Sequence, residues 1–224
     1  MENYDLAIYG HLTVDKIITG FKQTQTLGAM GNVWSTLSKL NSGINVKLRP
    51  TAIGEALIYI DEAAATRTGR ANLNLSTSKT KPQNSKWHHA MYLNLLEDKK
   101  FINDCSGITS ADVTAGKHDI EDYKNLDYLF ISDEDLFMDV EELARYIKGT
   151  VILHYPSGSY ASNGKDLKFH SSIDPINNVN VLGAGDIFAA CFMAKKISEY
   201  PVSIEATLHY AHSKTKEILE NGNK

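Results

Sequence analysis

The sequence has few cysteines and prolines, 2 and 5 of its 224 residues, and no apolar run of the roughly 20 residues that a membrane-spanning helix needs. Cys105 lies in a polar stretch and Cys191 in an apolar one, so the pair makes no disulfide framework of the kind that small secreted domains use. The N-terminus has no basic segment followed by an apolar one, so no secretory signal is expected. These absences predict a protein of the reducing cytoplasm.

An excess of charge of one sign is also absent. The 23 Lys and Arg residues nearly balance the 27 Asp and Glu residues, for a net charge of -4. No basic surface for nucleic acid or an anionic membrane is therefore expected, and a small-molecule partner is favoured. With 42% hydrophobic residues the chain is too apolar for disorder, and without a repeat or linker residues 1–224 are predicted to form a single domain.

Apolar strand-like runs alternate with helical patterns along the chain. Strands are predicted at Leu6–Tyr9, Tyr128–Ile131 and Val151–Leu153, and helices at Val33–Leu40 and Val140–Ile147. This alternation is typical of βαβ units, and it predicts the α/β class with a mostly parallel central sheet.

Two further segments predict a small accessory sheet. Lys16–Thr26 contains β-branched and aromatic residues around a glycine, as in a hairpin, and Ala71–Ser78 alternates like a strand with one wet face. Between that strand and the next structured segment, the polar residues Lys79–Lys86 are predicted to form an exposed loop.

The segment with the most chemical content is Gly183-Ala184-Gly185-Asp186, which follows a strand-like stretch at 178–182 and enters an apolar helix. Glycines directly before a buried helix let backbone N–H groups converge on one point, where the positive end of the helix dipole adds to them. The pattern indicates an anion hole, with Asp186 beside it as a candidate proton acceptor. The alternative is an ordinary tight turn with an acid that the helix dipole favours.

Other phosphate and metal motifs are absent. The chain has no GxxxxGK string followed by Ser or Thr, and Gly183-Ala184-Gly185 lacks the third glycine of a dinucleotide fingerprint. His88 and His89 are adjacent, so on a strand they point to opposite faces, and no third ligand is spaced to join them.

The Gly-Ala-Gly-Asp segment near the C-terminus resembles the signature of the ribokinase-like sugar kinases, the phosphofructokinase-B group. Other landmarks are similar to the family's pattern and come in its order: Tyr9-Gly10 followed by Asp15, the glycine-rich helix start Gly28–Val33, Ser132–Asp135 in place of an NxxE motif, and the strand and loop Val151–Gly158.

The resemblance implies a three-layer α/β/α sandwich with a reduced β lid, drawn from residues 16–26 and 71–78. It also implies transfer of the ATP γ-phosphoryl group to a primary hydroxyl of a sugar or nucleoside, with Mg²⁺ bridging the phosphates. A homodimer formed through the lid is a further expectation, although family members are usually longer than this chain.

Site residues follow from the same resemblance. Asp186 is expected to act as the base, and the backbone of Gly183, Ala184 and Gly185 to stabilise the transferring phosphoryl group. Asp15, Gly28 and Asn32 are expected to bind the acceptor. The remaining expectations are nucleotide contacts and one metal contact, at Ser132, Ser157, Gly158 and His212 for the nucleotide and Asp135 for Mg²⁺.

The chain also departs from the family's pattern. It has Leu27-Gly28 where two glycines are usual, Asn180-Val181 in place of Asp-Thr, and Ser132 and Asp135 in place of Asn and Glu. Tyr155 and Pro156 stand in a loop where the family prefers glycine. The departures at Ser132, Asp135, Tyr155 and Pro156 bear on nucleotide or metal binding.

Plainer roles stay open for four of these residues. Asp15 could cap a turn after a strand, and Asn32 could be the N-cap of the following helix. Asp135 could lie in a solvated acidic loop, and His212 on a helix surface.

Three functions are consistent with the pattern. The first is an active sugar or nucleoside kinase, which the intact Asp186 favours. The second is a kinase-derived protein that binds a sugar or nucleotide without efficient phosphoryl transfer. The altered residues favour it: Ser132, Asp135, Asn180 and Tyr155. The third is an unrelated α/β protein that carries the Gly-Ala-Gly-Asp string by chance.

Overall fold

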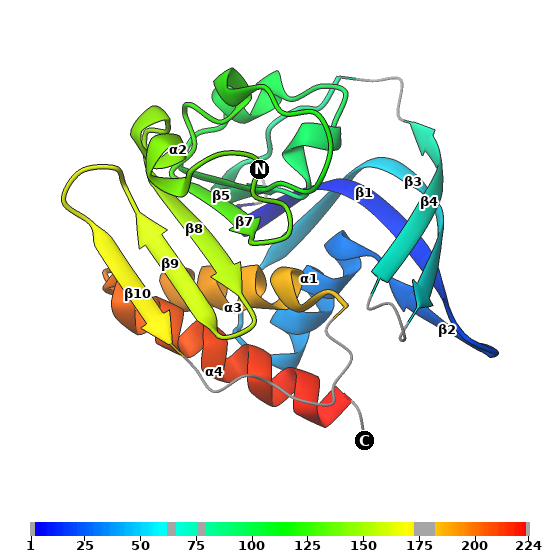
Figure 1. Cartoon of the computed structure of the whole chain (residues 1–224). Helices are drawn as coiled ribbons and strands as arrows, with labels where there is room; N and C mark the ends of the chain where they lie inside the picture. Colours follow the sequence, from blue (N-terminus) through cyan, green and yellow to red (C-terminus); the bar gives the residue numbers. More distant parts are fainter. Residues whose placement is uncertain (1–2, 62–65, 76–78, 173–181, 223–224) are drawn as a thin grey trace.

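The computed structural model describes residues 3–61, 66–75, 79–172 and 182–222. Within them, one ten-stranded sheet has the order β10-β9-β8-β7-β6-β5-β1-β3-β4, and β2 pairs with β1. Helices lie on both faces of this sheet (Figure 1). The predicted three-layer α/β class is therefore confirmed.

The elements have the following bounds. The strands are β1 (Tyr4–Thr19), β2 (Lys22–Leu27), β3 (Val46–Asp61), β4 (Thr66–Leu75), β5 (Ser85–Ala90), β6 (Ile108–Asp112), β7 (Tyr128–Ser132), β8 (Thr150–Tyr155), β9 (Gly158–Ser162) and β10 (Lys168–Ser172). The α-helices are α1 (Ala29–Lys39), α2 (Val140–Tyr146), α3 (Ala184–Ser198) and α4 (Ile204–Gly222). Three short 3-10 helices, at Leu93–Leu95, Lys100–Asp104 and Ile120–Asp122, complete the described part of the chain.

Strand β1 contributes to two hydrophobic cores because successive side chains of a strand point to opposite faces. Leu6 and Ile8 pack in the core beneath α1, α3 and α4, and Ala7 and Tyr9 pack in the core on the α2 side. All four are fully buried. Since burying one large apolar side chain contributes roughly 1.5–3 kcal/mol, this central strand fixes both helix layers to the sheet.

The strands from β3 through β1, β5, β6 and β7 to β8 are all parallel to their neighbours. Their carboxyl ends therefore meet at one edge of the sheet, where open α/β sheets bind ligands. Antiparallel pairs occur only toward the two ends of the described sheet: β8 with β9 and β9 with β10 on one side, and β1 with β2 and β3 with β4 on the other.

The accessory strands differ from the prediction of a separate small sheet. Strands β1 and β3 are each 16 residues long and continue in parallel beyond the main sheet, where β2 pairs antiparallel with β1 and β4 pairs antiparallel with β3. We call residues 12–27, 52–61 and 66–75 the strand extension (right side of Figure 1). A register irregularity between Gly10 and His11 marks the point where the paired strands leave the main sheet. The long strand β3 (Val46–Asp61) was not anticipated.

Most predicted elements have counterparts in the structure. The predicted hairpin at 16–26 corresponds to the paired ends of β1 and β2, and the strand at 71–78 is the second half of β4, with residues 76–78 outside the described part. Helix α1 begins four residues before the predicted start, because Gly28 is its N-cap. The predicted strand-like stretch at 178–182 lies outside the described residues except for its last residue.

The length and hydropathy of a helix decide whether it can span a membrane. Among the described residues, the helices are either too short or too polar to cross a bilayer.

Candidate active site

Helix α3 begins at a glycine that no other residue replaces without strain. Gly183, the N-cap, has φ +79°, and a Cβ atom there would lie 2.6 Å from the Asn32 Nδ2 atom. The first helical hydrogen bond runs from the Ile187 N–H to the Gly183 carbonyl at 3.0 Å. The N–H groups of Ala184, Gly185 and Asp186 come before it, so they have no partner within the helix and are the kind of donors that can bind an anion.

Asp186 lies in the first turn of α3 and is only 5% exposed. Its Oδ2 atom accepts a hydrogen bond from Asn32 Nδ2 at 2.8 Å, and its Oδ1 atom accepts one from the Tyr92 hydroxyl at 3.4 Å. Burial raises the pKa of Asp186 to about 7, with help from the nearby Asp112 and Asp15 carboxylates and against the two hydrogen bonds. Its carboxyl group can therefore exchange a proton near neutral pH.

Three predicted acceptor residues lie close to one another. Asp15 accepts a hydrogen bond from Thr13 Oγ1 at 2.6 Å within β1, and a Cβ atom on Gly28 would lie 3.1 Å from the Asp15 Oδ1 atom. Asn32 is in α1 and reaches Asp186 directly. The plainer roles for two of them are wrong, because Asp15 lies inside a strand and Gly28, not Asn32, is the N-cap of α1.

A cleft of about 220 Å³ opens beside Asp186 at the carboxyl ends of β6, β7 and β8. Helices α3 and α4 close its other side. The lining residues are Tyr92, Asp112, Val113, Phe130, Ser132, Asp133, Glu134, Asp135, His154, Tyr155, Pro156, Gly183, Ala184, Gly185, Asp186, Phe188, His212, Thr215 and Leu219. The cleft thus joins all four residues of the Gly-Ala-Gly-Asp segment to the two strand ends predicted to bind nucleotide and metal.

The Ser132–Asp135 turn has a fixed shape. The Ser132 hydroxyl donates to Asp135 Oδ2 at 2.8 Å and accepts from the Asp135 N–H at 3.2 Å. Asp135 Oδ1 accepts from the Ala115 N–H at 2.8 Å, which ties the turn to the loop after β6. Asp135 is therefore a half-buried turn residue of the cleft wall that hydrogen bonds hold in place.

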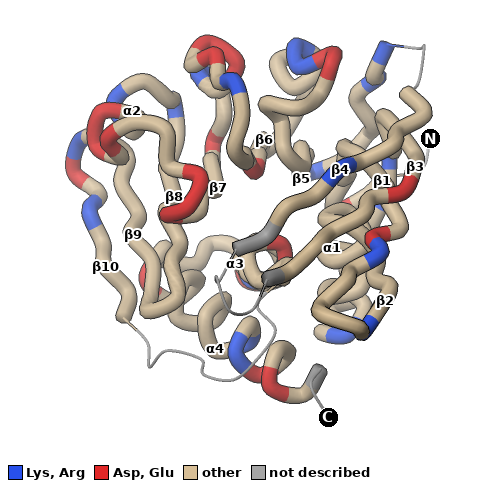
Figure 2. The backbone as a smooth tube through the Cα atoms, turned by 45° about the vertical axis from the view of Figure 1, so that its right-hand side comes forward, with Lys and Arg blue, Asp and Glu red and all other residues tan. Residues whose placement is uncertain are grey.

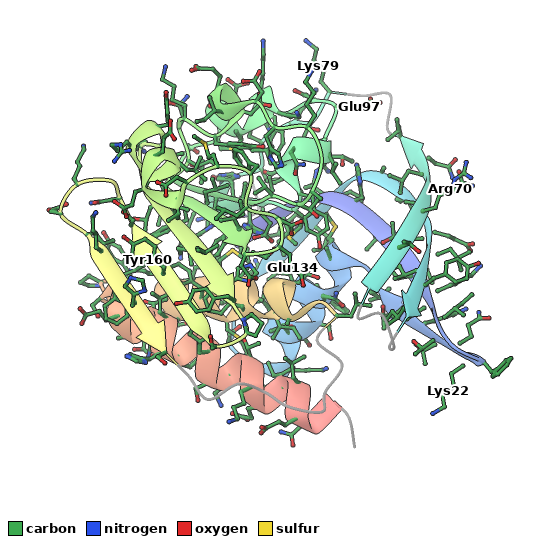
Figure 3. The ribbon with its side chains drawn as sticks, viewed as in Figure 1. Lys22, Arg70, Lys79, Glu97, Glu134 and Tyr160 are labelled. Carbon is green, nitrogen blue, oxygen red and sulfur yellow. The ribbon has the colours of Figure 1, made fainter. Side chains whose placement is uncertain are left out.

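The cleft is strongly acidic. The turn at 133–135 lies beside β8, where the Asp133 N–H donates to the His154 carbonyl at 3.1 Å (Figure 2). Glu134 from this turn lies near the start of α3, whereas Lys22 lies at the tip of the strand extension and Arg70 lies halfway along β4 (Figure 3). Within the described residues, the cleft lining contains five carboxylates and no Lys or Arg.

His212 lies on the buried side of α4 and is 5% exposed, so the alternative of a surface position is wrong. Its Nε2 atom lies 3.0 Å from the Ser159 hydroxyl, and its ring packs 4.8 Å from that of Phe188. Burial lowers the pKa of His212 to about 4, so the ring is neutral at physiological pH.

The β8–β9 turn is arranged differently from the prediction. Tyr155 and Pro156 line the cleft, whereas Ser157 is exposed and Gly158 packs against the backbone of β10. A Cβ atom on Gly158 would lie 2.0 Å from the Ser171 carbonyl oxygen, so this glycine serves the close approach of two strands. Of the described residues that line the cleft, neither Ser157 nor Gly158 is one.

Sequence reasoning missed several lining residues. Asp112 ends β6, is 7% exposed, and its Oδ2 atom lies 3.3 Å from Nε2 of the buried His89. The available signal in the sequence was that Asp112 is an acidic residue at the end of a short strand of mostly small residues. Tyr92 gave no such signal, because its hydroxyl reaches Asp186 from a distant part of the chain.

No protein-family profile matches this chain, and no curated protein sequence matches it. Solved structures do match. A probable sugar kinase from Rhizobium etli superposes with a TM-score of 0.75 at 14% sequence identity, over 98% of this chain and 94% of that one. A ribokinase from Thermotoga maritima superposes with a TM-score of 0.72 at 18% identity, over 95% of this chain and 92% of that one. This chain has the ribokinase fold.

An adenosine kinase from Sinorhizobium meliloti also has this fold, with a TM-score of 0.68 at 14% identity, over 97% of this chain and 94% of that one. The ribokinase fold accounts for the position of the cleft at the carboxyl ends of the parallel strands. Since a fold can carry different functions, the residues of the cleft must carry the functional argument.

Proposed function

We propose that this chain is a kinase that transfers the γ-phosphoryl group of ATP to a primary hydroxyl of a sugar or a nucleoside. The observation that carries the proposal is Asp186, a buried carboxyl group in the cleft, at the N-terminus of α3, with a pKa near 7. A general base works best when its pKa is close to the operating pH. The similarity to a ribokinase, a probable sugar kinase and an adenosine kinase supports the reaction class by analogy.

In this proposal Asp186 orients and then deprotonates the attacking hydroxyl. Asn32 holds the carboxylate in place through the 2.8 Å hydrogen bond, and Tyr92 does so from the other oxygen. These donors favour the ionised form, which alone can accept a proton. Asp15 and Asn32 also have polar atoms that can bind further hydroxyl groups of the acceptor.

The start of α3 stabilises the transferring group. Backbone N–H groups of Ala184, Gly185 and Asp186 have no partner in the helix and can donate to the negative charge that develops on the phosphoryl oxygens. Because these donors are fixed by the helix, no reorganisation is needed as the charge develops.

The lining fits a divalent cation together with a polyphosphate. Five carboxylates without Lys or Arg would repel the phosphates of ATP, so a cation between them is required by charge balance. Among the described residues no group of three or more His, Cys, Asp or Glu forms a ready-made site. Mg²⁺ is commonly held by one or two carboxylates with water and substrate phosphates, and Asp135 with Asp112 would supply these. When bound, Mg²⁺ would neutralise charge on the phosphates.

The nucleotide base would lie against α3 and α4. Phe188, Thr215, Leu219 and the neutral His212 offer an apolar surface with few polar atoms, as nucleobase sites need. Ser132 at the end of β7 lines the same cleft and would contribute its hydroxyl to nucleotide binding.

An ADP-release assay over hexoses, ketoses, pentoses and nucleosides tests the proposal. We expect acceptor-dependent turnover that falls at least about 100-fold in Asp186→Asn, as for loss of a general base. Asp104→Asn, which changes an exposed carboxyl outside the cleft, is the matched control and should keep wild-type turnover. Turnover that survives in Asp186→Asn would exclude Asp186 as the base.

The second candidate is a binding protein of the same fold without efficient transfer. It is favoured by Tyr155 and Pro156, two bulky side chains in the cleft wall next to the candidate phosphate site. Ligands that bind only the native state raise its stability. A rise in melting temperature with Mg·ATP or a sugar, without ADP release from any acceptor, would favour this function over catalysis.

A further inference from the structure

A buried chain of hydrogen bonds runs from the core to the cleft. Nε1 of Trp87 lies 2.7 Å from the Ser110 hydroxyl oxygen, which in turn lies 2.8 Å from Nδ1 of His89. Nε2 of His89 lies 3.3 Å from Oδ2 of Asp112, a residue of the cleft lining. Trp87, Ser110 and His89 are each at most 1% exposed. The chain therefore joins the interior of the protein to one carboxylate of the cleft.

The hydrogen-bond partners assign the tautomer of His89. The indole N–H of Trp87 can only donate, so the Ser110 oxygen accepts from it. The single hydroxyl proton of Ser110 points to Nδ1 of His89 at 2.8 Å, because the other acceptors within its reach lie 3.5 and 3.9 Å away. Since Nδ1 accepts, the ring proton is on Nε2, which donates to the Asp112 carboxylate.

Packing holds the His89 ring in this orientation. The ring of Phe130 lies 5.9 Å away at an interplanar angle of 78°, and Phe130 in turn packs 5.2 Å from Phe192 of α3. Among the described residues, the side-chain hydrogen bond of Asp112 is made by Oδ2. The second oxygen, Oδ1, therefore stays available to a ligand in the cleft.

Ser110, His89 and Asp112 are also the residue types of a serine nucleophile with its base and orienting acid. Here Ser110 is fully buried and its oxygen accepts the Trp87 N–H, so a substrate cannot reach this hydroxyl. Asp112 is the member of the chain that lines the cleft. The arrangement is therefore suited to hold a carboxylate and not to activate a hydroxyl.

We propose that His89 is a positioning residue for Asp112. Its Nε2–H holds one carboxylate oxygen, so that the other is presented to a divalent cation in the cleft. The inference rests on the part of the proposed function that assigns Asp112 to Mg²⁺. Hydrogen-bond partners of metal-binding carboxylates orient the ligand, and their loss typically weakens metal binding by about 10- to 100-fold.

The tautomer of His89 can be measured in the protein without metal or substrate. Long-range ¹H–¹⁵N NMR of labelled protein should show His89, identified by the signals that are lost in His89→Gln, with its proton on Nε2. Asp112→Asn should move the signal of this proton upfield, because an amide oxygen is a weaker acceptor than a carboxylate. A proton on Nδ1, or on both ring nitrogens, would overturn the inference.

Metal binding tests the consequence of the contact. Mn²⁺ is the probe, because it prefers the same oxygen ligands as Mg²⁺ and its free form is measured by electron paramagnetic resonance. His89→Leu removes the N–H and should weaken Mn²⁺ binding by about 10-fold or more. His89→Gln keeps an N–H donor and should stay within about threefold of the wild type. Unchanged binding in His89→Leu, or no Mn²⁺ binding by the wild type, would overturn the inference.

His88→Leu is the matched control. His88 is the preceding residue of β5, is equally buried, and both of its ring nitrogens also have hydrogen-bond partners, the Tyr9 hydroxyl and the Ser106 carbonyl. It lies on the opposite face of the sheet from His89. His88→Leu should lower the melting temperature but leave Mn²⁺ binding within about twofold of the wild type. Equal weakening of Mn²⁺ binding by both leucine substitutions would indicate a general loss of structure and would also overturn the inference.

A double substitution shows whether His89 acts through Asp112. Asp112→Asn alone should weaken Mn²⁺ binding, and addition of His89→Leu should weaken it by less than about twofold more, because residues that act through one contact are not additive. If the two losses multiply in full, His89 acts independently of Asp112 and the inference is wrong.

The outcomes separate this inference from the proposed function. If His89→Leu weakens Mn²⁺ binding as expected, but the wild type phosphorylates no acceptor with Mg·ATP, the kinase proposal fails and the role of His89 stands. If the wild type turns over and His89→Leu changes neither Mn²⁺ binding nor the Mg²⁺ concentration for half-maximal turnover, the kinase proposal stands and this inference fails.

Discussion

Replacing Asp186 with Asn should stabilise the fold at neutral and alkaline pH. Burial raises the pKa of this carboxyl to about 7, whereas in the unfolded chain it is near 3.9. Between these values the folded protein binds more protons than the unfolded one, so this group makes stability fall as pH rises. The difference of about three units between the two pKa values corresponds to a loss of roughly 4 kcal/mol in the free energy of unfolding. This loss is fully present above pH 7 and absent below about pH 4.

The substitution removes this penalty because the amide of Asn carries no charge. It also changes the hydrogen bond from Asn32, which would donate to a neutral amide oxygen in place of a carboxylate. That loss is about 1 kcal/mol. The net gain in the free energy of unfolding is therefore roughly 3 kcal/mol at pH 8, and close to zero at pH 4.5.

Urea unfolding of the wild type and Asp186→Asn at pH 8 and pH 4.5 measures this gain, and no substrate is needed. Asp104→Asn controls for the loss of an exposed carboxyl and should show little change at either pH. The reasoning is refuted if Asp186→Asn is no more stable than the wild type at pH 8, or if its gain is the same at both pH values.

Three further predictions concern activity. Asn32→Ala removes the 2.8 Å hydrogen bond to Asp186 and should move the acid limb of the pH–rate profile up by about one pH unit. Tyr92→Phe removes a 3.4 Å hydrogen bond and should move that limb less. A downward shift would contradict the assignment of this limb to Asp186. Gly183→Ala, at φ +79° and with no room for a Cβ beside Asn32, should lower both turnover and melting temperature, and normal values in an ADP-release assay and a thermal scan would contradict this. Asp135→Asn should raise the Mg²⁺ concentration for half-maximal turnover by about 10-fold or more, and an unchanged magnesium titration would exclude a metal role.

The parts of the site that the sequence predicts are local. Gly183 and Gly185 precede an apolar run, and this alone indicates a helix that begins in a buried turn with free N–H groups. The strands that end at Ser132 and near Tyr155 are short apolar runs between turn signals, so their place in a parallel sheet also follows from the pattern.

Contacts between distant segments were beyond such reasoning. Asn32 looks like a helix N-cap in the sequence, yet its amide donates to Asp186, 154 residues later, because α1 starts at Gly28 and turns Asn32 toward α3. The approach of α1 to α3 depends on both packing under the same face of the sheet, and no local pattern records this.

The direction of a loop was also beyond such reasoning. Ser157 and Gly158 were expected beside the nucleotide, but the β8–β9 turn presents Tyr155 and Pro156 to the cleft. Gly158 is needed where β9 passes the Ser171 carbonyl, a requirement set by strand pairing. A glycine in a turn therefore has more than one physical explanation, and the sequence alone does not choose between them.

The strained and charged features of the site depend on the helix that carries them. Gly183 has a left-handed backbone, and ionised Asp186 opposes folding by roughly 4 kcal/mol. Helix α3 also buries Phe188, Phe192 and Met193 between the sheet and α4. Each of these side chains contributes roughly 1.5–3 kcal/mol, so three of them outweigh the cost of the carboxylate. A buried carboxyl group with a pKa near 7 can thus be held rigidly because the same helix is part of the core, whereas on an exposed loop the carboxylate would relax by moving into water.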